Sequence, residues 1–334
     1  MSTQGKVLII AEVGSVHDGS FGNATRLIDV AADCGADAVK FQTHISEAET
    51  LRSAPMPPYF KGEPRFEYFQ RTGFTAEQWG RLKAHCGGRG IEFMSSPFSE
   101  EAVDLLEKVG VVRYKIPSGE VTNIPMLERI AATGKPVLLS SGMSDWKELD
   151  RAVAVLKGKV DLTVLQCATE YPCADKSVGL NVIGEMKARW GLKVGFSDHT
   201  TDNHAAFAAV ALGAVAVEKH LTFSRRMYGS DAPHSAEPSQ FADLVKGIRA
   251  ISAMLASPVD KSSAEAYRAM KLIFEKSVVS TVAISAGTVI TKSMVAVKKP
   301  GSGIPAARLD KVVGMRAARD IPADQLIAES DLRA

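Results

Sequence analysis

Two histidines, His199 and His220, end two successive short apolar runs, in the sequences Gly-Phe-Ser-Asp-His and Val-Glu-Lys-His. Two neutral imidazoles in such positions suit Mn²⁺, Zn²⁺, Fe²⁺ or Co²⁺. With only two protein ligands, coordination positions stay open for water and substrate oxygens, as in catalytic metal sites. A metal held there could polarise a carbonyl group or activate water. The alternative interpretation is a pair of structural histidines that only form hydrogen bonds.

Two lysines, Lys40 and Lys115, also lie within apolar runs. Buried lysines are scarce unless they are paired, so three roles need to be weighed. The first is a phosphate clamp completed by hydroxyl groups, the second is a structural ion pair with Glu12 or Glu120, and the third is a Schiff base. Two lysines with several hydroxyl groups favour anion binding over a single nucleophilic amine. The hydroxyl groups available to such a clamp belong to Ser96, Ser118 and Ser140.

These side chains need an ordered series of strands and helices to position them. Strand and helix patterns alternate as far as residue 255, which is typical of a parallel sheet. Eight strands and eight helices in this length favour a (β/α)8 TIM barrel. A doubly wound sheet is the alternative, but no GxGxxG turn follows the first strand. Ser99 and Ser239 are the expected N-caps of two helices. The predicted strands are 7–12, 38–42, 92–95, 112–116, 137–140, 162–166, 193–196 and 214–218, and the predicted helices are 23–34, 76–85, 100–109, 125–133, 146–156, 182–189, 203–212 and 240–255.

Active sites of such barrels form at the carboxyl ends of the strands. Every predicted strand ends in polar or ionisable residues or leads into them. Glu12 ends the first strand and Gln42 the second, while Tyr171 follows the sixth. We therefore expect the two histidines and the two lysines to share one cavity with these residues.

The pattern changes after the last predicted helix. We expect a catalytic barrel over residues 1–258, a linker over 259–275, and a small module over 276–334 in which short strands alternate with turns. A module of this size has little core of its own. We therefore expect it to pack on the barrel or on another subunit.

Composition limits the classes of function. The 334 residues include 40 basic and 38 acidic ones, giving a net charge of +2 without a basic block. This excludes an obvious nucleic-acid surface. No signal peptide or membrane span is visible. The four cysteines show no CxxC spacing, which indicates reduced thiols and a cytoplasmic protein.

Six runs in order along the chain resemble the sialic acid synthase family, which includes N-acetylneuraminate, legionaminate and pseudaminate synthases. The C-terminal module, with the sequence Val-Lys-Lys-Pro-Gly-Ser-Gly-Ile at 297–304, resembles the antifreeze-like (SAF) domain of that family. Each run alone is a weak signal, but together they are specific. The six runs are Ile10-Ala-Glu-Val-Gly, Lys40-Phe-Gln-Thr-His, Lys115-Ile-Pro-Ser-Gly-Glu, Leu139-Ser-Ser-Gly-Met, Gly195-Phe-Ser-Asp-His-Thr and Glu218-Lys-His-Leu-Thr.

The resemblance implies a condensation of phosphoenolpyruvate with an N-acetylmannosamine-type amino sugar and water, which yields a nonulosonate and phosphate. C3 of phosphoenolpyruvate attacks the open-chain aldehyde, water adds at C2, and phosphate leaves by C–O cleavage. The implied cofactor is a divalent metal, Mn²⁺ first, with Mg²⁺ or Co²⁺ as alternatives. The implied assembly is a domain-swapped homodimer.

The resemblance also assigns roles to individual residues. His199 and His220 would bind the metal, and Glu120 would be the acid/base beside the reacting carbons. Glu12 would share the catalytic role and contact the sugar. The residues expected to bind phosphoenolpyruvate are Lys40, Ser96, Lys115, Ser118, Ser140, Thr169 and Ser197, and those expected at the sugar are Gln42, Tyr171, Asp231 and Lys299.

Three departures from the family pattern border the sugar. Thr169 stands where an Asn is expected, Lys299 where an Arg is expected, and Ser15 lies in a loop that often carries Asn before the histidine. They leave N-acetylmannosamine, its 6-phosphate and a diacetamido sugar open as substrates. Legionaminate or another nonulosonate is therefore an alternative product. A different metal-dependent barrel aldolase and a non-catalytic sugar-binding protein are further alternatives.

Overall fold

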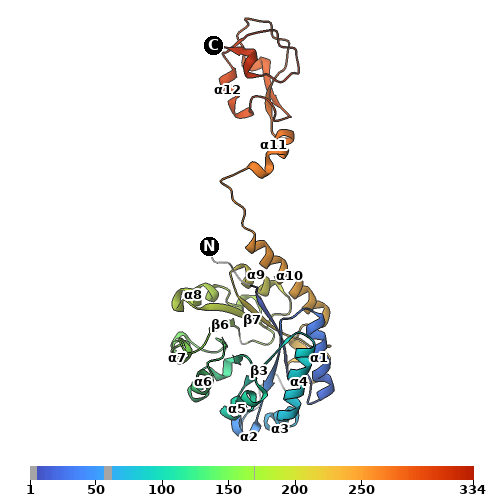
Figure 1. Cartoon of the computed structure of the whole chain (residues 1–334), viewed down its shortest axis with the longest axis vertical. Coiled ribbons are helices and arrows are strands. Elements are labelled where there is room, and N and C mark those ends of the chain that lie inside the picture. The colour runs from blue at the N-terminus through green and yellow to red at the C-terminus, as the bar shows by residue number, and fades with distance from the viewer. Residues whose placement is uncertain (1–5, 56–61, 169) are drawn as a thin grey trace. The chain divides into compact units, whose positions relative to one another are not determined.

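The computed structural model describes residues 6–55, 62–168 and 170–334. The chain divides into two compact units, of which the first ends at Pro258 and the second runs from Val259 to Ala334. The first unit is a (β/α)8 barrel, as the alternation of patterns predicted, and Figure 1 shows its helices arranged around the strands.

The barrel sheet contains eight parallel strands in the order β3-β2-β1-β8-β7-β6-β5-β4. The two end strands of this order, β3 and β4, lie beside each other without a continuous hydrogen-bond ladder. The strands are therefore neighbours all the way round, and their carboxyl ends share one mouth. The strands are β1 (Leu8–Gly14), β2 (Ala38–Thr43), β3 (Glu92–Pro97), β4 (Tyr114–Ile116), β5 (Val137–Ser140), β6 (Leu162–Cys167), β7 (Lys193–Asp198) and β8 (Ala216–His220).

The helices follow the predicted pattern with two corrections. Ser99 caps α5 by accepting a hydrogen bond from the Ala102 amide at 3.1 Å, but Ser239 is no cap, because α10 starts earlier, with Glu237 as N-cap and Pro238 in its first turn. Two short helices after β2, α2 and α3, were not predicted. No helix of the described part is long and apolar enough to cross a membrane. The helices of this unit are α1 (Phe21–Asp33), α2 (Ser46–Glu49), α3 (Arg65–Thr72), α4 (Ala76–Gly88), α5 (Glu100–Val109), α6 (Ile124–Ala131), α7 (Trp146–Leu156), α8 (Asn181–Trp190), α9 (His204–Ala211) and α10 (Pro238–Ala256).

The barrel has two apolar layers. The larger one lies between the strands and the surrounding helices, where amphipathic helices bury their apolar faces. The smaller one fills the barrel interior, because every second residue of a strand points inward. Its buried members are Ile10, Ala38, Met94, Leu138, Leu165 and Ala216.

Gly195 on β7 leaves room for this interior layer. A Cβ atom there would contact the Leu165 side chain and would lie 2.8 Å from the Ala216 carbonyl oxygen. We expect Gly195→Ala to lower the free energy of unfolding by about 1–3 kcal/mol, as overpacking does. The matched control is Gly184→Ala on α8, where an added Cβ meets nothing within 4 Å and helix propensity improves by about 0.5–1 kcal/mol. Urea unfolding curves of the two variants should shift in opposite directions, and equal shifts would contradict this packing argument.

The second unit contains short antiparallel strands around a small core. Strand β9 pairs with β10, and β11 pairs with β12. Nine buried residues, among them Val278 and Ile321, pack together, so the module has more of a core of its own than its length suggested. Its elements are α11 (Arg268–Phe274), β9 (Ser277–Ser280), β10 (Val295–Lys298), α12 (Leu309–Val312), β11 (Arg316–Ala317) and β12 (Leu332–Arg333).

Candidate active site

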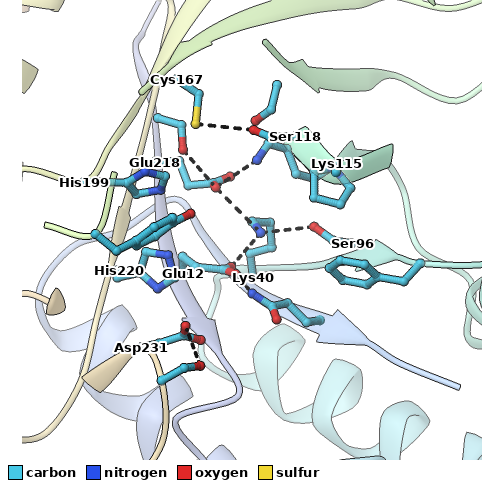
Figure 2. A pocket seen from close by; sticks show the side chains of 18 of the residues that line it. Glu12, Lys40, Ser96, Lys115, Ser118, Cys167, His199, Glu218, His220 and Asp231 are labelled. Carbon is cyan, nitrogen blue, oxygen red and sulfur yellow. Dashed lines mark hydrogen bonds and ion pairs between the residues drawn. The ribbon is translucent and has the colours of Figure 1, made fainter. Parts of the chain in front are cut away.

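A cavity of about 250 Å³ opens at the carboxyl ends of the strands. Most of the residues singled out from the sequence line it, and Figure 2 shows their polar ends pointing toward one another. The barrel thus brings together residues that lie far apart in the chain. The predicted residues that line the cavity are Glu12, Lys40, Gln42, Ser96, Lys115, Ser118, Ser140, Tyr171, Ser197, His199, His220 and Asp231.

The two-residue period of the strands explains which side chains enter the cavity. On β8, Glu218 and His220 point into it, whereas the Lys219 side chain between them points away. Lys219 is buried and donates to Asp198 at 2.7 Å and to the Thr200 carbonyl at 2.8 Å. This contact on the far side of the strands holds the segment that follows β7 and carries the first histidine.

Lys40 lies in an ion pair with Glu12. Its ammonium group is 2.7 Å from Glu12 Oε2 and donates to Ser96 Oγ at 3.1 Å. Glu12 on β1 is in register with Lys40 on β2 and with His220 on β8. Burial raises the pKa of Glu12 to about 7, although Lys40 lowers it. Glu12 can therefore take up and release a proton near neutral pH, which general acid–base catalysis requires.

Lys115 pairs with Glu218 and not with Glu120, one of the two partners considered from the sequence. Lys115 Nζ donates to Glu218 Oε1 at 2.9 Å, and Ser197 Oγ donates to the same oxygen at 3.3 Å. Burial alone would raise the pKa of Glu218, but the nearby Lys115 and Lys40 lower it to about 2. Both lysines thus stand as buried cations whose charge is already balanced by a carboxylate (Figure 2).

His199 and His220 are the candidate pair for a metal, although no group of three or more His, Cys, Asp or Glu side chains among the described residues is arranged to hold one. Their ring centroids are 5.6 Å apart. The Nδ1 atom of His199 is 2.8 Å from the Ala168 carbonyl oxygen, so Nδ1 carries the hydrogen and Nε2 is the nitrogen that a metal would use; the same side chain also interacts with the Cys167 thiol. The Nδ1 atom of His220 is buried without a hydrogen-bond partner among the described residues. A buried nitrogen of this kind is costly unless something binds it, so the two side chains suit a shared cation.

The loop after β1 contacts Asp231, a residue that follows β8 and lines the cavity. The Ser15 amide donates to Asp231 Oδ2 at 3.3 Å, and the Ser15 hydroxyl lies 2.9 Å from the hydroxyl of Tyr68 on α3. Gly14 has a φ of +56°, and a Cβ on it would collide with the Asp231 carboxylate. A glycine is therefore required where this carboxylate meets the backbone.

Three other predicted residues have to be considered separately. Glu120 does not line it; its carboxylate accepts a hydrogen bond from Asn123 at 2.8 Å, and burial raises its pKa. Thr169 lies outside the described residues. Lys299 belongs to the second unit, where its ammonium group lies 5.1 Å from the centre of the Phe274 ring. The roles of these three residues stay predictions, as do those of the residues that line the cavity.

Several lining residues were missed by sequence reasoning. Glu218 could have been found, because it lies two residues before His220 on one strand and must face the same side. Cys167 was interpreted only as a reduced thiol, yet it lines the cavity and accepts a hydrogen bond from Ser118 at 3.6 Å. Arg65 on α3 also lines the cavity, but it lies in a segment without a periodic pattern, and no sequence signal marks it.

A TIM barrel whose mouth holds paired lysines, acidic residues and two metal-suited histidines defines an enzyme active site. The NeuB family model matches residues 27–260, and the SAF domain model matches residues 275–333. The chain belongs to the NeuB family and carries a SAF domain, as its motifs predicted. It is therefore a synthase of the nonulosonate type and not a sugar-binding protein without catalytic activity.

Relatives support this assignment along nearly the whole chain. The chain is 36% identical to an N,N'-diacetyllegionaminic acid synthase of Campylobacter jejuni, with 97% of this chain and 99% of that protein covered. It is 34% identical to the human N-acetylneuraminate-9-phosphate synthase, with coverage of 96% and 91%. The crystal structure of an N-acetylneuraminic acid synthetase from Leptospira borgpetersenii in complex with citrate matches with a TM-score of 0.70 and 32% identity, covering 80% of this chain and 91% of that one.

Proposed function

We propose that the protein condenses phosphoenolpyruvate with an N-acetylmannosamine-type amino sugar and water to give a nonulosonate and phosphate. The observation that carries the proposal is the cavity itself. It holds two buried lysines, a row of hydroxyl groups and two histidines suited to a metal. Sites that bind anions use such charge-assisted hydrogen bonds.

The lysines and serines account for phosphoenolpyruvate binding. Lys40 and Lys115 are cations in a site where water is scarce, so their attraction for a phosphate is stronger than at the surface. Ser96 already contacts Lys40, and Ser197 contacts the partner of Lys115. The bound phosphate would exchange these contacts for its own, while the two carboxylates prevent an excess of positive charge in the empty site.

A divalent metal, Mn²⁺ first among the candidates, would be held by His199 and His220. When bound, it supplies Lewis acidity to the aldehyde oxygen of the sugar. C3 of phosphoenolpyruvate forms the new bond to the aldehyde carbon, which becomes an alcohol. Water adds at C2, and phosphate departs with the bridging oxygen. Glu12, whose pKa lies near 7, is placed to hold the proton released by the water.

The test is phosphate release by the purified protein in the presence of phosphoenolpyruvate, Mn²⁺ and one sugar at a time. We expect release only when both metal and sugar are present. The panel contains N-acetylmannosamine, its 6-phosphate and a 2,4-diacetamido sugar, with products identified by mass spectrometry. Borohydride with pyruvate should trap no adduct, because Lys115 is engaged by Glu218. No phosphate release with any sugar would disprove the proposal.

A homodimer is part of the proposal. Residues 254–274 carry several large apolar side chains that are exposed, and such residues are normally covered by a partner. Light scattering after size exclusion should give twice the mass of 35.7 kDa, and a monomer would contradict this. The exposed residues are Met254, Leu255, Val259, Tyr267, Met270, Leu272, Ile273 and Phe274.

Arg65 provides a further prediction about anion binding. Its guanidinium group lies 4.9 Å from the centre of the Phe69 ring and has no carboxylate partner among the described residues. Both cavity lysines are paired with carboxylates, so Arg65 can bind an anionic substrate group in addition to them without breaking an ion pair of its own. We expect Arg65→Ala to raise the KM of an anionic substrate about tenfold, the effect of one lost charged hydrogen bond, and Arg65→Lys to raise it less.

The kinetic measurement compares KM for phosphoenolpyruvate, for the neutral sugar and for the phosphorylated sugar. The control is Arg52→Ala, which removes another arginine stacked on a phenylalanine, Phe66, but outside the cavity. A selective rise for one anionic substrate would show which group Arg65 binds. Unchanged KM values for all three substrates would contradict the prediction.

A further inference from the structure

His44 follows β2, lines the cavity and is held between two aromatic rings. Its ring lies between two phenylalanines, with centroid distances of 3.6 Å to Phe69 and 4.0 Å to Phe98. Its side chain is only 4% exposed. The two rings fix the plane of the imidazole, so its two nitrogens can meet only the groups that lie in that plane.

A chain of hydrogen bonds leads from this ring to Glu12. His44 Nδ1 lies 2.8 Å from Glu49 Oε1 on α2, and His44 Nε2 lies 3.1 Å from Gln42 Oε1. The amide nitrogen of Gln42 donates to Glu12 Oε1 at 2.9 Å. Gln42 is therefore gripped at both ends of its amide group, by His44 on one side and by Glu12 on the other.

Each hydrogen bond from Glu49 through His44 to Gln42 needs one donor and one acceptor, which limits the protonation states that His44 and Glu49 can adopt. The amide oxygen of Gln42 only accepts, so His44 Nε2 must carry a hydrogen. Either His44 is an imidazolium facing an ionised Glu49, or it is a neutral ring facing a protonated Glu49. In both cases the His44–Glu49 pair holds one proton and has no net charge.

The environment favours keeping that proton within the pair. Glu49 Oε2 is buried and has no hydrogen-bond partner among the described residues, which is costly for an ionised carboxylate. Burial lowers the pKa of His44, while Glu49 and the more distant Asp231 raise it and Arg65 lowers it further. The geometry therefore places one shared proton between His44 Nδ1 and Glu49 Oε1 and leaves the hydrogen of His44 Nε2 facing Gln42.

Loss of the proton shared by His44 and Glu49 would reverse the orientation of the Gln42 side-chain amide. A bare Nε2 would face the oxygen of Gln42, and two acceptors repel each other. The amide would then turn, which would place its oxygen against the carboxylate of Glu12. This turn would break the contact between Gln42 and Glu12 and change what the amide offers to a ligand in the cavity.

We propose that His44 and Glu49 form a buried, singly protonated pair that sets the amide orientation of Gln42 for the sugar site. The role in the sugar site rests on the proposed function, whereas the orientation of the Gln42 amide does not depend on it. His44 is thus a positioning residue that acts through Gln42. Its effect should be larger on the sugar than on phosphoenolpyruvate, because His44 bonds directly to Gln42, whereas it reaches Lys40 only through Gln42 and Glu12.

The first experiment reads the hydrogen directly. ¹⁵N NMR of the full-length protein labelled at histidine distinguishes protonated from bare ring nitrogens, and the His44 signals are assigned by their absence in His44→Phe. That variant keeps an aromatic ring between Phe69 and Phe98. We expect Nε2 of His44 to carry hydrogen at the pH at which the enzyme is assayed. A bare Nε2 there would overturn the proposal.

The second experiment is kinetic. We expect His44→Phe to raise the KM for the sugar about tenfold, as for one lost hydrogen bond in a binding site, with the KM for phosphoenolpyruvate changed less than about twofold. The single variant Glu49→Gln should keep nearly normal KM values for both substrates, because the new amide can donate to His44 Nδ1 and keep the hydrogen on Nε2. The control is His85→Phe, which removes a second histidine–carboxylate pair, with Asp29 at 2.7 Å, outside the cavity.

The outcomes separate the two ideas. Equal rises of both KM values in His44→Phe, or a Glu49→Gln variant as impaired as His44→Phe, would overturn the positioning role. His44→Phe leaves Glu49 without its partner, which can lower the free energy of unfolding. Unfolding curves of His44→Phe and of the double variant His44→Phe/Glu49→Gln measure this loss of stability separately from the change in KM. If the unmodified protein releases no phosphate with any sugar, the proposed function fails, while the NMR result still decides the orientation of Gln42.

Discussion

His220→Ala is expected to lose metal-dependent phosphate release by about a thousandfold, equivalent to about 4 kcal/mol of transition-state stabilisation. The reason is geometric. The Nδ1 atom of His220 is buried without a hydrogen-bond partner in the described part of the chain, and the contact of His199 Nδ1 with the Ala168 carbonyl leaves Nε2 as the nitrogen that a metal would use. The site offers two histidine ligands, and removing either leaves only one, which is too few to retain a catalytic cation. Metal content after dialysis against Mn²⁺ should fall together with the rate.

His204→Ala is the matched control for this loss. The His204 side chain is 88% exposed on the surface of the barrel and pairs with Asp202, so its removal should leave both metal content and rate unchanged. Circular dichroism must show that His220→Ala is folded, because a buried ring is lost as well. A folded variant that keeps its metal and its rate would exclude this pair as the metal site and would favour the interpretation of structural histidines.

The fold could be predicted because strand and helix patterns differ in period and alternate without interruption. Boundaries were less certain, because apolar residues also occupy the turns. The eighth strand was expected over 214–218 but spans Ala216–His220. The shift is small, yet it places His220 within the strand and in register with Glu12 on β1. Hydrogen bonds to neighbouring strands set such limits, and the local sequence does not contain them.

Most of the cavity could be predicted because a barrel collects strand ends at one mouth. Pairing across the mouth could not. Lys115 and Glu218 are separated by 103 positions in the sequence and meet only when the barrel closes. The expected partner, Glu120, is much nearer in the sequence but lies beyond the strand end and bonds to Asn123 instead.

The segment between β2 and α4 was the least predictable part of the site. Its helices α2 and α3 span only four and eight residues. His44 could be seen as a polar residue after a strand, but its role depends on Phe69 and Phe98, which come from two other segments. A residue that acts through neighbours distant in sequence leaves no local pattern.

Lys115→Met should reduce both activity and stability. Activity is expected to fall about 10²–10³-fold, as for other lost charge-stabilising donors, because phosphoenolpyruvate loses a cation. The free energy of unfolding should fall by about 3–5 kcal/mol, because Glu218 would stay buried with its main partner gone. Lys40, at 3.7 Å from Glu218, can compensate only in part. Steady-state kinetics and urea unfolding measure the two effects on the same preparation.

The double variant Lys115→Met/Glu218→Gln separates stability from catalysis. Removing both charges abolishes the buried, unpaired carboxylate, so stability should return to within about 1–2 kcal/mol of the original, while activity stays low. The surface control is Lys193→Met, which breaks a pair with Asp161 at 2.9 Å whose side chains are more than half exposed, and it should cost no more than about 1 kcal/mol.

Kinetics and unfolding of Lys115→Met and of the double variant together decide between the roles considered for the lysines. A phosphate clamp requires that the KM for phosphoenolpyruvate rise in both Lys115 variants, whether or not stability is restored. A purely structural pair requires that activity return together with stability in the double variant. If it does, the cation is dispensable for the anion, and the phosphate must be held by Lys40, Arg65 and the serines alone.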